Sequence, residues 1–575
     1  MRKWPLGAVL VSAGLLLTAC TSVPRLPPPS TDIDETAFRE HLRTLAADDF
    51  EGRKPGTAGE QKTLAYLADG FRKLGLKPGN GESFLQQVPM VEILTGADAV
   101  LSIAGHGRTL KFAYGKDMVV WTQQAVPQVE IKDSELVFVG YGIVAPEYGW
   151  NDYAGIDVHG KTVVALVDDP GYATRDPKLF KGGAMTYYGR WAYKIGEAAR
   201  HGAAGVLLVH DGDAMGFGWN VIQSTWSGPQ LHLAAADGGV APGDEAPGNA
   251  APGNGAPGDA VQNETGRAAL AGFIQKDAAR ALFTAAGLDF TASAAAAARS
   301  GFKALPLGLR AQATLHNSVR QFSSANVAAL LPGGSRRREY VLYTAHWDHL
   351  GRDPARPGHN IFNGATDNAS GVAGLLTLAQ SFVRTKPAAD RSIVFLALTG
   401  AEPRLLGSRY YVEHPLYPLR DTAAVLNLDT LHRGGPSRDL TIFAPGNSDL
   451  EEFARGAALL QGRDVTAEPG EERGRYFRSD SLSFAKAGVP VLYAQSGLDD
   501  AARGPVWGKA QLDDYMAHRY RQPADQYSAD WDVRGALDDL RLYYQVGNRV
   551  ARSRRFPRWY PNSEFRQNSA SLAAP

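Results

Sequence analysis

The spacing of apolar residues changes along the chain, and each change indicates a different kind of element. Apolar side chains recur at helical spacing over residues 38–45 and again over residues 64–74. The second pattern opens with Thr57-Ala58-Gly59-Glu60, which has the spacing of a capping box, and it closes at Gly75. The folded region is therefore predicted to begin with two amphipathic helices.

Short β-type runs follow this helical start. They occupy residues 136–139, 163–167 and 206–209, and one helical segment precedes the last of them. This grouping predicts a separate small α/β unit. From residue 305 to about residue 550, strand and helix patterns alternate, which is the signature of a larger α/β domain.

A five-residue repeat interrupts the small unit, with Ala-Pro-Gly beginning at positions 241, 246, 251 and 256. The repeat has no apolar side chains to bury, so residues 237–265 are predicted to form a disordered surface loop. Residues 33–130 are assigned to the N-terminal part of the main domain, and residues 131–304 to the small unit. The rest of the main domain is assigned to residues 305–560 and a tail to residues 561–575.

The N-terminus has the pattern of an export signal. A basic start and an apolar run precede Leu17-Thr18-Ala19-Cys20, which resembles the end of a bacterial lipoprotein signal peptide. Residues 1–19 are interpreted as this signal, Cys20 as the lipidated residue and residues 20–32 as a proline-rich tether. The alternative is an uncleaved anchor with a chance cysteine. The expected location is the bacterial cell envelope, with a lipid anchor in the outer membrane and the protein facing the periplasm.

Composition narrows the classes of partner and site. The 575 residues are 44% hydrophobic and 21% charged, which is ordinary for globular domains. Sixty basic residues balance sixty acidic ones, so nucleic acid is not expected as a partner. The one cysteine excludes an internal disulfide and a cysteine-rich zinc site. A transition metal must therefore be held by histidine and carboxylates.

Candidate ligands of that kind stand where predicted strands of the main domain end. Three apolar runs lead into His346, Glu402 and Asp429. In open α/β sheets the ligand site lies beyond the carboxyl ends of the strands. A fourth carboxylate, Asp367, precedes an apolar helix. An aspartate at that position also serves as an ordinary helix cap, so its sequence position alone leaves both roles open.

Taken together, these motifs resemble the co-catalytic zinc aminopeptidases, a family that includes bacterial leucyl aminopeptidases and, more distantly, glutamate carboxypeptidases. The resemblance covers nearly all of the mature chain. It rests on residues 45–57, the His346 and Asp367 motifs, and residues 405–408, 427–429, 478–490 and 523–525. It implies an α/β fold in which helices sandwich a mixed sheet of the zinc-exopeptidase type. Residues 140–142 and 202–209 resemble the β-rich protease-associated domain that many of these enzymes carry as an insertion.

The resemblance also implies roles for individual residues. His346 and Asp429 correspond to ligands of a first zinc, Asp367 to the carboxylate that bridges two metals, and Glu402 to a ligand of the second. Asp348 corresponds to a catalytic-site residue that orients the His346 ring.

Two positions depart from the family pattern where chemistry is done. Ala401 stands at the position of the general base, and Arg521 at that of a histidine ligand of the second metal. A third difference places Ser481 where the family usually has histidine. The Arg521 guanidinium is suited to pairing with Glu402 in place of the second metal. His518 is an alternative substitute ligand, and His432 is a weaker one.

These observations predict a zinc metallopeptidase-like lipoprotein of the aminopeptidase type that acts on peptides. One zinc is expected rather than two, and the activity is expected to be impaired because the base and one ligand are replaced. The alternative is a non-catalytic protein of the same descent that binds peptides or an envelope partner.

Overall fold

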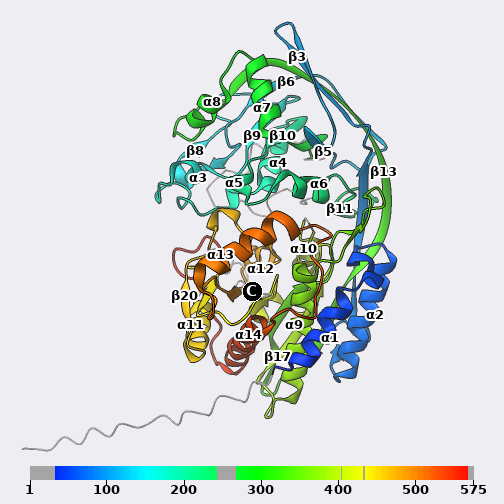
Figure 1. Cartoon of the computed structure of the whole chain (residues 1–575), viewed down its shortest axis with the longest axis vertical. Coiled ribbons are helices and arrows are strands. Elements are labelled where there is room, and N and C mark those ends of the chain that lie inside the picture. The colour runs from blue at the N-terminus through cyan, green and yellow to red at the C-terminus, as the bar shows by residue number, and fades with distance from the viewer. Residues whose placement is uncertain (1–32, 242–266, 403, 432–433, 567–575) are drawn as a thin grey trace, which may run out of the picture.

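The computed structural model describes residues 33–241, 267–402, 404–431 and 434–566 (Figure 1). The predicted signal peptide, Cys20, the tether and most of the Ala-Pro-Gly repeat lie outside the described residues. Within the described ranges, no helix combines the length and apolar character needed to cross a bilayer.

The two N-terminal helices form as predicted, although one of them begins differently. Helix α1 is Glu35–Leu45, and its N-cap Asp34 accepts a hydrogen bond from a backbone N–H. Helix α2 is Ala58–Lys73, but its N-cap Thr57 makes no side-chain cap because its hydroxyl donates to a backbone carbonyl. Glu60 accepts instead from the backbone N–H of Gly56 and from a serine hydroxyl of a neighbouring strand. The predicted capping box is therefore replaced by one contact of Glu60 with the preceding turn and one with a strand of the sheet.

The main sheet is mixed. Its strands run in the spatial order β11 (Gln230–Leu233), β2 (Leu85–Thr95), β13 (Leu305–Leu331), β17 (Arg391–Leu398), β14 (Arg336–His346), β18 (Thr422–Asn427), β21 (Val491–Ser496), β19 (Asp439–Ile442) and β20 (Asp464–Thr466). The four central strands, from β17 to β21, are mutually parallel, whereas β13 and β19 pair antiparallel with them. The parallel strands all end at one edge, which is where the candidate ligands were expected.

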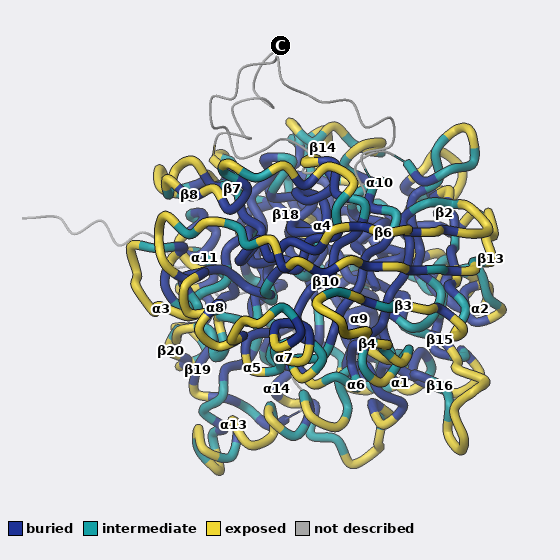
Figure 2. The backbone as a smooth tube through the Cα atoms, turned by 90° about the horizontal axis from the view of Figure 1, so that it is seen from above, coloured by how far each residue is buried: buried dark blue, intermediate teal, exposed yellow. Residues whose placement is uncertain are grey.

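Helices cover both faces of this sheet, as the fold-class prediction requires. One face packs on α1, α2, α9 (Ser370–Arg384), α11 (Leu450–Leu460) and α14 (Arg534–Arg552). The opposite face packs on α10 (Leu406–Glu413) and α12 (Ser481–Lys486). Along β14, Val341 and Tyr343 belong to the first core and Leu342 to the second. Successive side chains of a strand point to opposite faces, so a buried central strand is apolar throughout. Figure 2 shows this buried centre beneath an exposed rim of loops.

A second sheet lies above the first (Figure 1). It contains β3 (Val100–Gly105), β4 (Arg108–Phe112), β5 (Met118–Trp121), β6 (Gln128–Phe138), β9 (Thr162–Leu166), β10 (Gly205–Val209) and β12 (Leu270–Ile274). Its associated helices include α4 (Trp191–Arg200), α6 (Trp219–Trp226), α7 (Lys276–Ala285) and α8 (Phe290–Ala297). The strands predicted near residues 136, 163 and 206 are confirmed as β6, β9 and β10.

Strand β13 connects the two sheets without a break. Its first part pairs with β3 and β6, and its second part pairs with β2 and β17. In Figure 1 this strand runs along one side of the molecule and joins the upper elements to the lower ones. The domain boundaries stay predictions. The upper sheet includes strands from outside residues 131–304. Strands β3, β4 and β5 precede residue 131, and the first part of β13 follows residue 304.

The Ala-Pro-Gly loop begins later than the predicted residue 237. Val240 is 2% exposed and packs with Val91 and Ile93, and Ala234 forms a β-bridge with Val240. Val240 precedes the first repeat unit and has an apolar side chain. It can therefore be buried, unlike the repeat, which has no apolar side chains to bury. Residues 242–265 of the predicted loop lie outside the described residues.

Candidate metal centre

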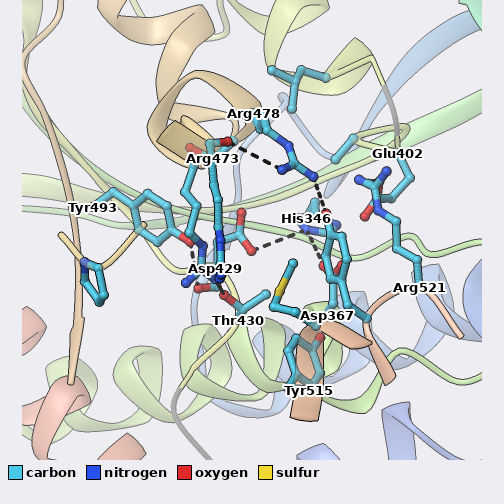
Figure 3. Close-up of a pocket in the computed structure, with 17 residues that line it drawn as sticks. His346, Asp367, Glu402, Asp429, Thr430, Arg473, Arg478, Tyr493, Tyr515 and Arg521 are labelled. Atoms are coloured by element: carbon cyan, nitrogen blue, oxygen red, sulfur yellow. Dashed lines mark hydrogen bonds and ion pairs between the residues drawn. The ribbon is translucent and has the colours of Figure 1, made fainter. Parts of the chain in front are cut away.

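His346 is the last residue of β14, and the candidate ligands gather around its ring (Figure 3). The Nε2 atom of His346 lies 3.4 Å from Asp367 Oδ1 and 3.9 Å from Asp429 Oδ1. Ligand atoms of His346, Asp367 and Glu402 all lie within 4.8 Å of one another. The structure therefore brings together the four residues that the sequence predicted as metal ligands.

The local chain explains how each ligand reaches this place. Asp367 lies in the short helical turn Ala365–Ala369, directly before α9, and Asp429 follows the end of β18. Asp525 positions the Asp367 loop because its carboxylate accepts from the backbone N–H groups of Thr366 and Asp367, at 3.1 Å each. Asn368 joins the two ligand loops, since its side-chain amide donates to Leu428 O at 3.0 Å.

Burial and opposite charge act together on these groups. Burial alone lowers the pKa of His346, but Asp367 and Asp429 raise it well above its ordinary value. Burial raises the pKa of Asp367, yet the neighbouring histidines and Arg521 lower it well below its ordinary range. The two carboxylates therefore favour a positive charge beside them, and a metal ion would have to displace the proton of His346 in order to bind there.

The donor set fits a zinc ion. Zinc is bound by histidine nitrogen and carboxylate oxygen at about 2.0–2.1 Å in tetrahedral geometry, which separates adjacent ligand atoms by about 3.4 Å. The His346–Asp367 separation matches this edge. His346, Asp367 and Asp429, the ligands expected from the sequence, would provide the three protein ligands that a catalytic zinc site uses. In the structure, however, the ligand atoms that all lie within 4.8 Å of one another are those of His346, Asp367 and Glu402, and Asp429 approaches His346 Nε2 to 3.9 Å.

Glu402 is held by an arginine. It forms an ion pair with Arg521, and both side chains are buried. Burial raises the pKa of Glu402 and Arg521 opposes that rise. Arg521 also donates to Thr225 Oγ1 at 3.4 Å. The pairing of Glu402 with Arg521 agrees with the sequence interpretation, and it occupies the carboxylate on which a second metal would depend.

Asp348 acts on the site through the backbone as well as through its carboxylate. Its backbone carbonyl lies 3.1 Å from His346 Nδ1, whereas its carboxylate is 3.9 Å from that atom. The carboxylate accepts from the backbone N–H groups of Ala401 and Glu402, at 3.0 and 3.3 Å. Asp348 therefore connects the His346 ring to the loop that follows β17.

We expect Asp348→Asn to weaken zinc binding by about 10- to 100-fold, because the amide replaces one acceptor of this network with a donor. A competition titration against a chromophoric chelator measures the affinity. Asp353→Asn, at an exposed position, is the matched control. Equal zinc affinity in the two variants would show that the network does not position the ligands.

Two of the remaining sequence candidates, His518 and Ser481, do not line the cavity that contains the ligands. His518 is 72% exposed in its side chain and lies 3.1 Å from Asp514, so the substitute-ligand interpretation is wrong for the structure as it stands. The surface helical turn that carries His518 points this ring to solvent. Ser481 is buried at the start of α12 and does not line the cavity around the ligands. His432 lies outside the described residues.

Structure reveals contributions that the sequence interpretation did not assign. Arg53 is fully buried and donates to four backbone carbonyls, those of Leu45, Trp347, Asn363 and Gly364. Arg473, Arg475 and Arg478 line the cavity that contains the ligands. For the arginines of the cavity wall, the sequence signal was their clustering, with three arginines within residues 473–478.

Comparisons with known proteins find similarity to peptidases over part of the chain. Residues 326–545 match the model of peptidase family M28. A vacuolar membrane protease of Schizophyllum commune is 29% identical over 218 residues, which are 33% of this chain and 22% of that protein. A probable zinc metalloprotease of Pyrenophora tritici-repentis is 27% identical over 209 residues, which are 35% of this chain and 47% of that protein. The chain thus spans less than half the length of either relative.

The whole fold has a counterpart among solved structures. An aminopeptidase from Aneurinibacillus sp. strain AM-1 aligns over 93% of this chain and 95% of its own, with a TM-score of 0.50 and 19% identity. The likeness covers both sheets and supports the mixed α/β architecture.

Proposed function

We propose, on the premise that residues 326–545 form a peptidase family M28 domain, that this protein is a slow, zinc-dependent peptidase of the aminopeptidase type. The observation that carries the proposal is the convergence of His346 with Asp367 and Asp429 at the carboxyl edge of the sheet. A bound zinc supplies a polarised carbonyl and a more acidic water. The chain supplies the ligands, the enclosed site and the substrate contacts.

The slow rate follows from what the chain lacks at residue 401. Among the described residues that line the cavity, the carboxylates are Asp367, Glu402 and Asp429. Two of these are proposed zinc ligands and the third is paired with Arg521. No lining carboxylate is therefore free to accept the proton of the attacking water, and loss of a positioned base commonly costs about 10²- to 10⁴-fold in rate.

Zinc reconstitution of the purified protein tests the proposal. We expect measurable hydrolysis of aminoacyl-anilides and short peptides that a chelator abolishes and zinc restores. His346→Ala should remove both zinc binding and hydrolysis, whereas His316→Ala, at an exposed position outside the cavity, should change neither.

A non-catalytic peptide-binding protein is the second candidate, because the Arg521–Glu402 pair removes a ligand that a two-metal site needs. Peptide binding without zinc and without hydrolysis would contradict the enzyme proposal and support this candidate.

A further inference from the structure

The wall of the metal cavity contains three arginines from one segment of the chain. Arg473, Arg475 and Arg478 belong to the segment that leads from β20 to α12, and Figure 3 shows two of them beside the candidate ligands. None forms a salt bridge with a carboxylate in the part of the chain that the structure describes. Their side-chain hydrogen bonds go to neutral groups: Arg478 donates to Tyr520 Oη at 2.7 Å, and Arg475 donates to Thr430 Oγ1 at 2.6 Å. Asp429 and Glu468 act electrostatically on Arg475, and Glu472 acts on Arg473, without forming a salt bridge among the described residues.

This cavity carries an excess of positive charge. Its described lining includes four arginines and three carboxylates, and a zinc ion adds two further positive charges. One of the four arginines, Arg521, is already paired with Glu402. In such a field a substrate carboxylate gains charge-assisted hydrogen bonds from guanidinium groups.

A second cavity adjoins the first across the same arginines. Its empty space is about 570 Å³, part of which is open to solvent, and Arg473, Arg478 and Arg521 line both cavities. Its other walls are largely apolar, with Trp191 from α4 and Trp226 from α6 in a T-shaped pair whose ring centroids lie 5.7 Å apart. Further lining side chains are Met185, Met215 and Phe217.

Two polar side chains stand in the wall of this largely apolar cavity. Asp168 and Arg190 also line it. Burial and the neighbouring Asp169 carboxylate raise the pKa of Asp168, which disfavours its charged form. The tryptophan, methionine and phenylalanine side chains of the wall suit an apolar side chain, and the guanidinium groups stand at the junction with the metal site.

We propose that the substrate is a short peptide with an apolar C-terminal residue, whose carboxylate contacts Arg473 and Arg478 while its side chain enters the cavity of Trp191 and Trp226. This assignment rests on the proposed peptidase function. It follows from the order of the groups: metal ligands first, then unpaired guanidinium groups, then an apolar cavity. The peptide must be short, because the arginines and the metal ligands line a single cavity.

Uncleavable analogues test this assignment on the zinc-loaded protein. The probes are the reduced-bond dipeptide Leu-Phe with a free carboxylate, the same compound as its C-terminal amide, and the reduced-bond Leu-Ala acid. We expect calorimetry to show that the Leu-Phe acid binds at least tenfold more tightly than either of the others, because each lacks one of the two recognised groups.

Variants locate the carboxylate contact. The double change Arg473→Gln with Arg478→Gln should abolish the difference between acid and amide, whereas Arg478→Lys should keep part of it because the cation remains. Arg72→Gln, at an exposed ion pair far from the cavity, should behave as the wild type. A thermal melt of each variant separates loss of binding from loss of fold, and the acid–amide comparison on the wild type needs no variant.

Three outcomes would overturn the inference. They are equal binding of acid and amide, no binding of any analogue, and a strong preference for glutamyl-anilide over leucyl-anilide, which would assign the arginines to an N-terminal acidic side chain. Acid-selective binding without hydrolysis of any peptide would remove the proposed enzymatic function alone. Hydrolysis without acid selectivity would remove this inference alone.

Discussion

The double variant Ala401→Glu with Arg521→His is expected to bind two zinc ions and to hydrolyse aminoacyl-anilides about 10²- to 10⁴-fold faster than the wild type. Glutamate at residue 401 restores a base next to the site. Histidine at residue 521 removes the guanidinium that pairs with Glu402 and provides a second-metal ligand. Zinc content per chain and kcat/KM are measured on the same preparations.

Each single change should have a smaller effect than the pair. Ala401→Glu adds a base but leaves Arg521 on Glu402, and Arg521→His frees Glu402 without adding a base, so the two effects depend on each other. Arg519→His, at a half-exposed position, is the matched control for the second substitution. A double variant that holds two zinc ions and remains as slow as the wild type would show that residue 401 does not determine the rate.

Arg53→Met is expected to lower the free energy of unfolding by about 3–5 kcal/mol. The guanidinium donates to four buried carbonyls, and methionine fills similar space but leaves these acceptors without partners. Two of the carbonyls, those of Trp347 and Gly364, lie close in sequence to His346 and Asp367. Zinc affinity should therefore fall together with stability.

Urea unfolding followed by tryptophan fluorescence measures the stability change. Arg43→Met, at an exposed position of α1, provides the comparison for the same chemical substitution. Similar unfolding midpoints for the two variants would mean that the Arg53 contacts contribute little to the native state.

Local sequence patterns predicted the elements that carry the ligands. His346 follows a continuous apolar run, and a buried central strand requires such a run because both of its faces are covered. The same reasoning placed Glu402 and Asp429 after β17 and β18, and parallel strands bring these chain ends to one edge. The position of the candidate site in the fold was therefore accessible from the sequence.

Contacts between distant segments were less accessible. The hydrogen bonds of Arg53 reach backbone carbonyls near residues 347 and 364, and no local pattern specifies which carbonyls an arginine will meet. The uninterrupted β13 joins two sheets that the grouping of short β-type runs had assigned to separate units. His518 was expected near the metal because it lies close to Arg521 in sequence. Its ring is exposed instead, because closeness in sequence does not determine the direction of a side chain.

The pairing of Glu402 with Arg521 could be inferred because it depends on charge chemistry rather than on detailed packing. The arginines at residues 473, 475 and 478 were visible as residue types, but their place in the cavity wall, without a salt bridge to any described carboxylate, became evident only from the tertiary contacts.

Diffraction at the zinc absorption edge, from crystals of the zinc-loaded wild type, tests the account most directly. We predict one anomalous peak per chain, from a zinc ion bound by His346, Asp367 and Asp429, with Arg521 still in contact with Glu402. A second peak at Glu402 with Arg521 displaced, or no peak at His346, would contradict the account.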